Sequence, residues 1–139
     1  MPGDGATAGN LREAFAREAQ SALRALYFAR RADVEGFADV ASLLRSIAEG
    51  ECGHGFGHLE FLEELSDPLS GAGDTRGNLE SALVETEANG DAYAGYAKAA
   101  AREKRADAAD WFSSVAAAEQ AHAAQLRRLL RMFDEDRRA

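Results

Sequence analysis

Apolar residues recur at helical spacing along four stretches of the chain. The first stretch follows Asn10, a residue type that caps helix N-termini, and it ends at Gly36, a residue type that ends helices. Its apolar positions are Leu11, Phe15, Ala22, Leu26 and Ala29. A second stretch with the same spacing runs from about Phe37 to Leu65. The pattern therefore predicts a helical hairpin over residues 10–65.

The second half of the chain has the same organisation. Residues 66–77, SDPLSGAGDTRG, are rich in turn-forming residues and are predicted to be a linker. Asn78 is predicted to cap a third helix, which turns near Arg105 into a fourth helix ending near Phe133. Residues 78–133 thus form a second hairpin, and residues 10–134 one domain. We expect residues 1–9 to be a flexible N-terminus and residues 135–139 a solvated tail. Two such hairpins predict an all-α protein, a four-helix bundle.

The two halves are related by an internal repeat. When the sequence is shifted by 68 residues, GNL at 9–11 falls on GNL at 77–79, and Phe28 falls on Tyr96. Under the same shift, Glu51 meets Glu119 and His54 meets His122. Helices rich in alanine share alanines by chance, but not a Glu-x-x-His pair in register with flanking aromatics. The repeat indicates a duplicated hairpin.

The stretch GECGHGFGH at 50–58 permits two structures. As a loop, it would bring Cys52, His54 and His58 together as a metal knuckle. The repeat favours a helix, because the equivalent segment AEQAHAAQL at 118–126 has a plainly helical pattern. A single cysteine also argues against structural zinc, which takes four closed ligands. Each glycine then costs the helix about 1 kcal/mol relative to alanine. We interpret Cys52 as a bystander thiol.

Composition excludes several classes of function. The chain has 139 residues and a formal net charge of -8, which disfavours nucleic acid as a partner. No apolar run is long enough to span a bilayer, and the N-terminal segment lacks the apolar stretch of a signal peptide. The single cysteine is typical of a reducing compartment. We expect a cytoplasmic protein without a membrane partner.

The duplicated Glu-x-x-His pair points to metal chemistry. Residues three apart share one face of a helix, so each pair offers a carboxylate and an imidazole to the same point. Two such helices and one glutamate from each of the other two make a dinuclear metal site in a four-helix bundle. Glu18 supplies the glutamate of the first helix. The repeat maps Glu18 onto Thr86, a poor ligand, which leaves Glu85 and Glu87 as alternatives for the third helix.

With these residues, the sequence resembles rubrerythrin and its relatives in the ferritin-like superfamily. The matching segments are NLREAFAREAQSALRALYFA, AEGECGHGFGHLEFLEEL, ETEANGDAYAGYAKAA and SVAAAEQAHAAQLRRLL. The resemblance places Glu18, Glu51, Glu119 and His122 on ligand positions, and His54 on a histidine that can join the metal. Matching the third helix through its tyrosines selects Glu85 over Glu87.

The same resemblance implies the cofactor and the surroundings of the site. The cofactor would be two iron ions bridged by carboxylates, with manganese or zinc as the alternative metals. Tyr93 would hydrogen-bond a ligating carboxylate or merely pack, and His58 would lie beside the site or be a satisfied buried histidine. Rubrerythrins carry a further glutamate one turn along the third helix, where this chain has Ala88. That departure implies a more symmetric centre with six ligands. No rubredoxin domain follows, as in the short erythrin-type members.

The resemblance implies a non-haem di-iron oxidoreductase that reduces hydrogen peroxide to water. Its electrons would come from an external donor such as a separate rubredoxin. A second hypothesis is ferritin-like iron oxidation and handling, in which oxygen is the oxidant and iron is the substrate. A third is a metal-free helical interaction module whose acids lie on the surface.

The length of the linker bears on assembly. In a ferritin-like bundle the connection between the second and third helices runs back along the whole bundle. Twelve residues from Ser66 to Gly77 reach at most about 40 Å when fully extended. A helix of about 22 residues is about 33 Å long, so this crossing leaves the linker stretched. We therefore expect a homodimer in which two chains exchange hairpins.

Overall fold

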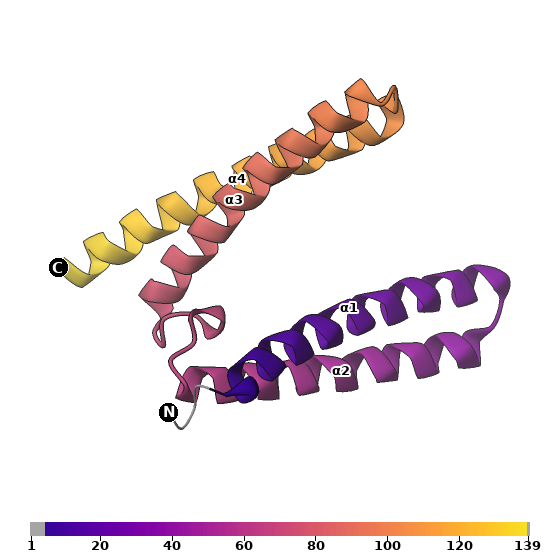
Figure 1. Cartoon of the computed structure of the whole chain (residues 1–139), viewed down its shortest axis with the longest axis horizontal. Helices are drawn as coiled ribbons and strands as arrows, with labels where there is room; N and C mark the ends of the chain where they lie inside the picture. Colours follow the sequence, from indigo (N-terminus) through magenta and orange to yellow (C-terminus); the bar gives the residue numbers. More distant parts are fainter. Residues whose placement is uncertain (1–4, 139) are drawn as a thin grey trace. The chain divides into compact units, whose positions relative to one another are not determined.

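The computed structural model of the chain describes residues 5–138 and consists of four long helices joined by short turns (Figure 1). In chain order these are α1 (Ala6–Glu35), α2 (Ala38–Glu64), a short 3-10 helix η1 (Pro68–Ser70), α3 (Thr75–Arg102) and α4 (Ala106–Arg138). The described residues contain no strand. The all-α prediction is confirmed.

The chain divides into two compact units, Met1–Gly71 and Ala72–Ala139, which we describe separately. In the first unit, α1 packs along α2 to form the first hairpin, and in the second unit α3 packs along α4 to form the second. The contact between α1 and α2 is made by small side chains, and Leu62 is the large one that is fully buried there. The other buried hydrophobic residues of this hairpin are Ala22, Ala25, Ala29, Ala32, Ala41 and Ala48. Alanines at these positions let the two helix backbones approach closely and leave the large apolar residues on the outer faces.

The turns of the two hairpins have equivalent residues in the same left-handed backbone conformation. Gly36 follows α1 with φ 87°, a left-handed conformation that glycine adopts without steric cost. Lys104, its equivalent 68 residues later, also has a left-handed backbone, with φ 62°. The predictions that Gly36 ends the first helix, that the second helix lies between Phe37 and Leu65, and that the chain turns near Arg105 are confirmed.

The predicted N-terminal caps were wrong. Helix α1 begins at Ala6, so Asn10 lies inside it, and Gly5 is the N-cap. Residues 6–9, which were predicted to be part of a flexible N-terminus, are therefore helical, because alanine, threonine and one glycine do not stop a helix. Residues 1–4 lie outside the described residues. Helix α3 begins at Thr75, after Asp74, whose carboxylate accepts a hydrogen bond of 2.7 Å from the Gly77 N–H.

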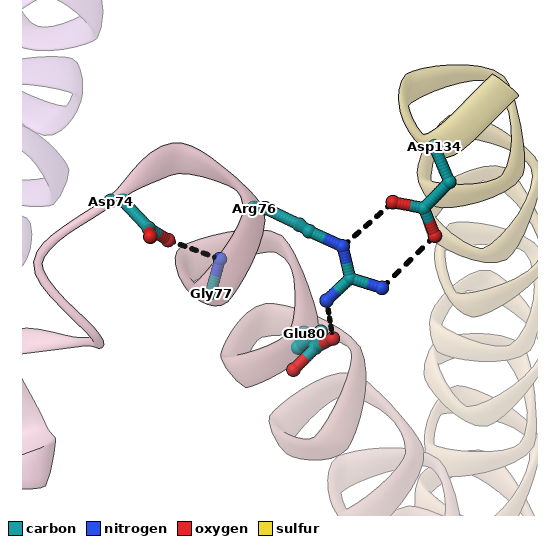
Figure 2. A network of polar contacts seen from close by, with 5 residues as sticks. All are labelled: Asp74, Arg76, Gly77, Glu80 and Asp134. Carbon is teal, nitrogen blue, oxygen red and sulfur yellow. Dashed lines mark hydrogen bonds and ion pairs between the residues drawn. The ribbon is translucent and has the colours of Figure 1, made fainter. Parts of the chain in front are cut away.

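Both ends of the second hairpin depart from prediction. Asn78 lies within the first turn of α3, where its side-chain oxygen accepts a hydrogen bond from the Ala72 N–H at 2.8 Å. At the other end, α4 continues past Phe133 to Arg138. Asp134 binds both Nε and Nη2 of Arg76, at 2.7 and 2.9 Å, and the same guanidinium contacts Glu80 (Figure 2). Residues 135–138 of the predicted solvated tail are thus helical, an ion pair holds Asp134 just before them against α3, and residue 139 lies outside the described residues.

The linker is folded rather than extended. Asp67 caps η1 by accepting a hydrogen bond from the Leu69 N–H at 2.9 Å, and it forms an ion pair with Arg12 on α1. The Ser70 hydroxyl donates to the backbone oxygen of Asp67 at 2.8 Å. These contacts attach the first part of the linker to the first hairpin.

The glycine-rich stretch of α2 is helical, as predicted. Gly55 faces α1, and a β-carbon there would lie 3.9 Å from the β-carbon of Glu18. Gly50, Gly53 and Gly57 have nothing within 4 Å of an added β-carbon, so packing within the first hairpin does not require them. In residues 5–138 we found no helix with the length and apolar character of a membrane span.

Candidate metal centre

One side of α2 carries a glutamate and two histidines between apolar residues. Residues spaced by three or four positions lie along one side of a helix, and on α2 such a series runs from Leu43 to Leu65. Its members are Leu43, Ile47, Glu51, His54, His58, Phe61 and Leu65. Leu43, Ile47, Phe61 and Leu65 are all exposed in the first unit. A water-facing helix surface rarely has this composition, so the stripe is suited to burial against another apolar surface.

The equivalent stripe on α4 repeats this arrangement. Its members are Trp111, Val115, Glu119, His122, Leu126, Leu129 and Phe133. Each of these residues lies 68 positions after its counterpart on α2. Trp111 and Leu129 are exposed in the second unit, like Leu43 and Phe61 in the first. The two hairpins therefore each present a Glu-x-x-His pair that is flanked on both sides by bulky apolar residues.

The first hairpin brings Glu18 and His54 together across the two helices. His54 Nδ1 lies 3.5 Å from Glu18 Oε1, and the Glu18 side chain is 24% exposed. Gly55 faces this part of α1, because a β-carbon added there would lie 3.9 Å from the Glu18 β-carbon and 3.9 Å from the Phe15 ring. The structure thus brings a carboxylate of α1 and an imidazole of α2 close together.

Glu51 has an unusual environment. The residue is half-buried, and its Oε2 atom is inaccessible to solvent and has no hydrogen-bond partner among the described residues. An unpartnered buried carboxylate oxygen is costly, because it has lost its hydration without gaining a donor. A cation at this oxygen would remove that cost. This orphaned atom lies one helical turn before His54, on the stripe described above.

The second hairpin presents a similar pair on one helix. His122 Nδ1 lies 3.3 Å from Glu119 Oε1, and the Glu119 side chain is 19% exposed while that of His122 is largely open. Glu119 is partly covered because Gly90 on α3 faces it, and an added β-carbon on Gly90 would lie 3.8 Å from the β-carbon of Glu119. The hydrophobic pattern does not distinguish Gly90, although its counterpart under the repeat is Ala22, a buried residue of the first hairpin.

The two alternatives on α3 lie in different surroundings. Glu87 forms an ion pair of 3.0 Å with Arg127 on α4, and both residues line a shallow pocket with Gln120 and Asp91. Glu85 is exposed and lies two residues away, about 200° around the helix. On α4, Gln120 lies about 160° around the helix from His122, and Arg127 lies about 140° around it. The face that carries Glu87 is therefore the face away from His122.

Thr86, the repeat counterpart of Glu18, is engaged within its own helix. Its hydroxyl donates a hydrogen bond of 2.7 Å to the Ala82 backbone oxygen. Tyr93 is half-buried and packs in an aromatic cluster, with ring centroids 5.6 Å from Tyr96 and 6.1 Å from Phe112. This aromatic packing is sufficient to explain the half-buried position of Tyr93. His58 is half-buried, and Cys52 is an exposed free thiol.

Within each hairpin the ligand set is incomplete. Among residues 5–138 no three side chains of the kinds that bind metals lie close enough together to hold an ion. The first hairpin contributes Glu18, Glu51 and His54, and the second contributes Glu119 and His122 together with an exposed Glu85. Carboxylates and imidazoles in these proportions suit iron, manganese and zinc. The donor set and the orphaned oxygen of Glu51 fit a divalent metal, and each hairpin carries three of the six predicted ligands.

Two comparisons with known proteins bear on this site. A family model described as rubrerythrin matches residues 9–130. The curated protein Rubrerythrin-1 of Clostridium acetobutylicum is 32% identical over 142 residues, an alignment that covers 94% of this chain and 73% of the relative. The match spans all six of the residues that the sequence pattern and its resemblance assigned to the metal.

Proposed function

Because the chain belongs to the rubrerythrin family, we propose that it is a di-iron oxidoreductase that reduces hydrogen peroxide to water. The observation that carries this proposal is the repeated stripe of the two hairpins, in which Glu51 and His54 on α2 match Glu119 and His122 on α4. Acid and histidine survive within apolar surfaces when a metal neutralises them.

The six proposed ligands are Glu18, Glu51, His54, Glu85, Glu119 and His122. Four carboxylates balance the charge of two divalent ions, and one histidine is available to each ion. The ion pair between Glu87 and Arg127 supports Glu85 as the ligand of α3, because Glu87 already has a cationic partner on the other face. When bound, the iron pair would supply two electrons to hydrogen peroxide, which with two protons becomes two molecules of water.

The residues of the chain have three tasks in this reaction. The carboxylates would bind the metal pair and balance its charge, which would allow the two Glu-x-x-His stripes to be buried together. The large apolar residues on either side of each pair exclude water when the two stripes are buried, which strengthens the electrostatic interactions inside. Tyr93 is held by its packing with Phe112, and its hydroxyl is the group we propose to hydrogen-bond a ligating carboxylate.

Metal analysis tests this proposal. Purified protein loaded under anaerobic conditions should bind two irons per chain, and Glu51→Ala or Glu119→Ala should abolish binding of the pair. Glu49→Ala changes an exposed acid two residues from Glu51 and serves as the matched control, which should retain both irons. Two irons per chain in both ligand variants would contradict the assignment.

The oxidant is tested with the same loaded protein. Ferrous protein should be oxidised by peroxide much faster than by oxygen, and the iron should remain bound over several turnovers. Faster oxidation by oxygen followed by loss of iron would instead support ferritin-like iron handling. Protein that binds no metal at all would support a helical interaction module.

A further inference from the structure

The side of α1 that faces away from α2 carries a stripe of exposed apolar and basic residues. Leu23, Tyr27 and Val34 are 70%, 63% and 76% exposed there. Tyr27 lines two neighbouring hollows, one with Gln20, Leu23, Arg24 and Phe28 and the other with Arg30, Arg31 and Val34. We call these residues, from Gln20 to Val34, the outer α1 surface.

The charge of the outer α1 surface is opposite to that of the whole protein. Arg24, Arg30 and Arg31 are exposed, and none of them pairs with a carboxylate among the residues that the structure describes; Arg24 lies over the Phe28 ring at 5.3 Å. From Gln20 to Val34 the one acid is Asp33, which forms an ion pair with Arg45 on α2 at 2.9 Å. The chain as a whole carries a net charge of -8. An acidic partner is therefore repelled by most of the molecule and attracted here.

The position of the surface relative to the proposed ligands is fixed by the helix. Tyr27 follows Glu18 by nine residues, which places it about 180° around α1. Glu18 contacts His54 on the side that we propose to be buried with the metal, so Tyr27 points away from that side. A helix with its side chains is about 10–12 Å across. Nine residues also separate the two positions by about 13.5 Å along the helix axis, so a molecule bound at Tyr27 would lie about 17 Å from this proposed metal ligand.

We propose that the outer α1 surface is the docking site of a small acidic electron-transfer protein. This inference rests on the proposed function, which consumes two electrons per peroxide and so requires a donor. Two reduced donors would dock in turn, each losing one electron while one ferric ion gains it. Exposed tyrosine flanked by arginines is the composition of binding hot spots, and the arginines steer an acidic partner to this orientation.

Binding to a redox-inactive partner tests the surface independently of iron chemistry. The probe is zinc-substituted rubredoxin, a small acidic protein, titrated into isotope-labelled full-length protein at low ionic strength. Shifts should be confined to α1, and both Tyr27→Ala and the double variant Arg30→Glu/Arg31→Glu should weaken binding by about tenfold or more. The double variant Arg128→Glu/Arg131→Glu changes the charge equally with exposed residues of α4 and should alter affinity less than about twofold.

Electron transfer gives the second readout. Reduction of the oxidised, iron-loaded protein by reduced rubredoxin should slow by about tenfold or more in the α1 double variant, while reduction by dithionite should not change. Equal losses in the α1 and α4 variants, or shifts that map elsewhere, would overturn the docking site and leave the proposed function standing. Loss of self-association in the α1 variant without loss of donor binding would also overturn it, as would binding of anionic lipid vesicles but not of rubredoxin. Failure to bind iron would contradict the proposed function alone.

Discussion

Gly90 on α3 lies directly against Glu119 on α4, so that a β-carbon on Gly90 would stand 3.8 Å from the β-carbon of Glu119. That distance is ordinary van der Waals contact, so a methyl group fits there. The proposed ligand therefore depends on a small residue across the hairpin. In the first hairpin, Gly55 has the same relationship with Glu18, at 3.9 Å.

Gly90→Ala and Gly90→Leu should consequently have opposite effects. Alanine fits and should stabilise α3 by about 1 kcal/mol, because glycine is the weaker helix former. Leucine needs the volume that Glu119 and Gln120 occupy, so it should displace Glu119 and lower iron content. Urea unfolding and iron analysis measure the two effects. Gly95→Leu is the control, since nothing lies within 4 Å of an added β-carbon there. Full iron content in Gly90→Leu would show that the position of Glu119 does not matter.

The two glutamates of α3 can be distinguished by substitution. Glu85→Ala should lower iron content and peroxide activity severely, because it removes a proposed ligand. Glu87→Ala should leave both largely intact and lose only the exposed ion pair with Arg127, an interaction that contributes little to stability. Iron content of the purified variants is the measurement. Equal losses would mean that the face assignment of α3 is unreliable, and the reverse order would make Glu87 the ligand.

Acid should weaken the attachment of the linker to the first hairpin. Hydrogen bonding from the Leu69 N–H and the ion pair with Arg12 lower the pKa of Asp67 below its ordinary value. A group whose pKa is lowered by folding stabilises the protein above its unfolded pKa of about 3.9, and this contribution is lost as the pH falls through the folded pKa. Asp67→Asn should therefore be less stable than the parent at pH 7, and the difference should shrink towards pH 2.

Unfolding midpoints of both proteins at the two pH values provide this measurement. Asp110→Asn alters an exposed acid of α4 and is the control, which should show little difference at either pH. A gap between Asp67→Asn and the parent that is equally large at pH 2 would mean that the carboxylate charge does not stabilise the linker.

The sequence predicted the helices and most of their ends, because those depend on local signals. Gly36 was recognisable as a helix end since a left-handed residue follows α1, and glycine favours that conformation. The N-terminal cap of α3 was missed because two residue types competed for the role. Asp74 and Asn78 both suit a cap, but Asp74 has a backbone N–H three residues later at the right distance, whereas Asn78 instead binds the linker at Ala72.

The candidate site was predictable in part. Spacing alone places Glu51 with His54 and Glu119 with His122, and the repeat relates the two pairs. Spacing does not show which glutamate of α3 lies on the correct face, because Glu85 and Glu87 both neighbour Thr86. That choice depends on Arg127, a partner 40 residues away along the chain that periodicity does not identify. The orphaned oxygen of Glu51 is likewise a property of packing between helices.

The folded linker bears on how the chain completes its metal centre. On one side, Asp67 binds Arg12 and its N–H donates to the Leu62 backbone oxygen at 2.9 Å. On the other side, the Ala72 N–H donates to Asn78, and the Gly71 N–H donates to the Pro68 backbone oxygen at 3.0 Å, so the two fastened segments follow one another directly. Helix α2 has 27 residues and is about 40 Å long. A linker with these contacts is too short to run back along that length, as the connection in a ferritin-like bundle must.

We therefore propose a homodimer in which two chains exchange hairpins, so that each metal centre takes Glu51 from one chain and Glu119 from the other. Differently tagged Glu51→Ala and Glu119→Ala chains, co-refolded and purified as heterodimers, test this. With exchange, one centre lacks both acids and the other keeps all six ligands, so a heterodimer should bind two irons. Without exchange, each centre lacks one acid and no complete centre forms. Each variant homodimer is the control and should bind no iron pair in either case. Heterodimers without a complete centre would rule out exchange, while iron binding in the parent protein would still support the proposed function.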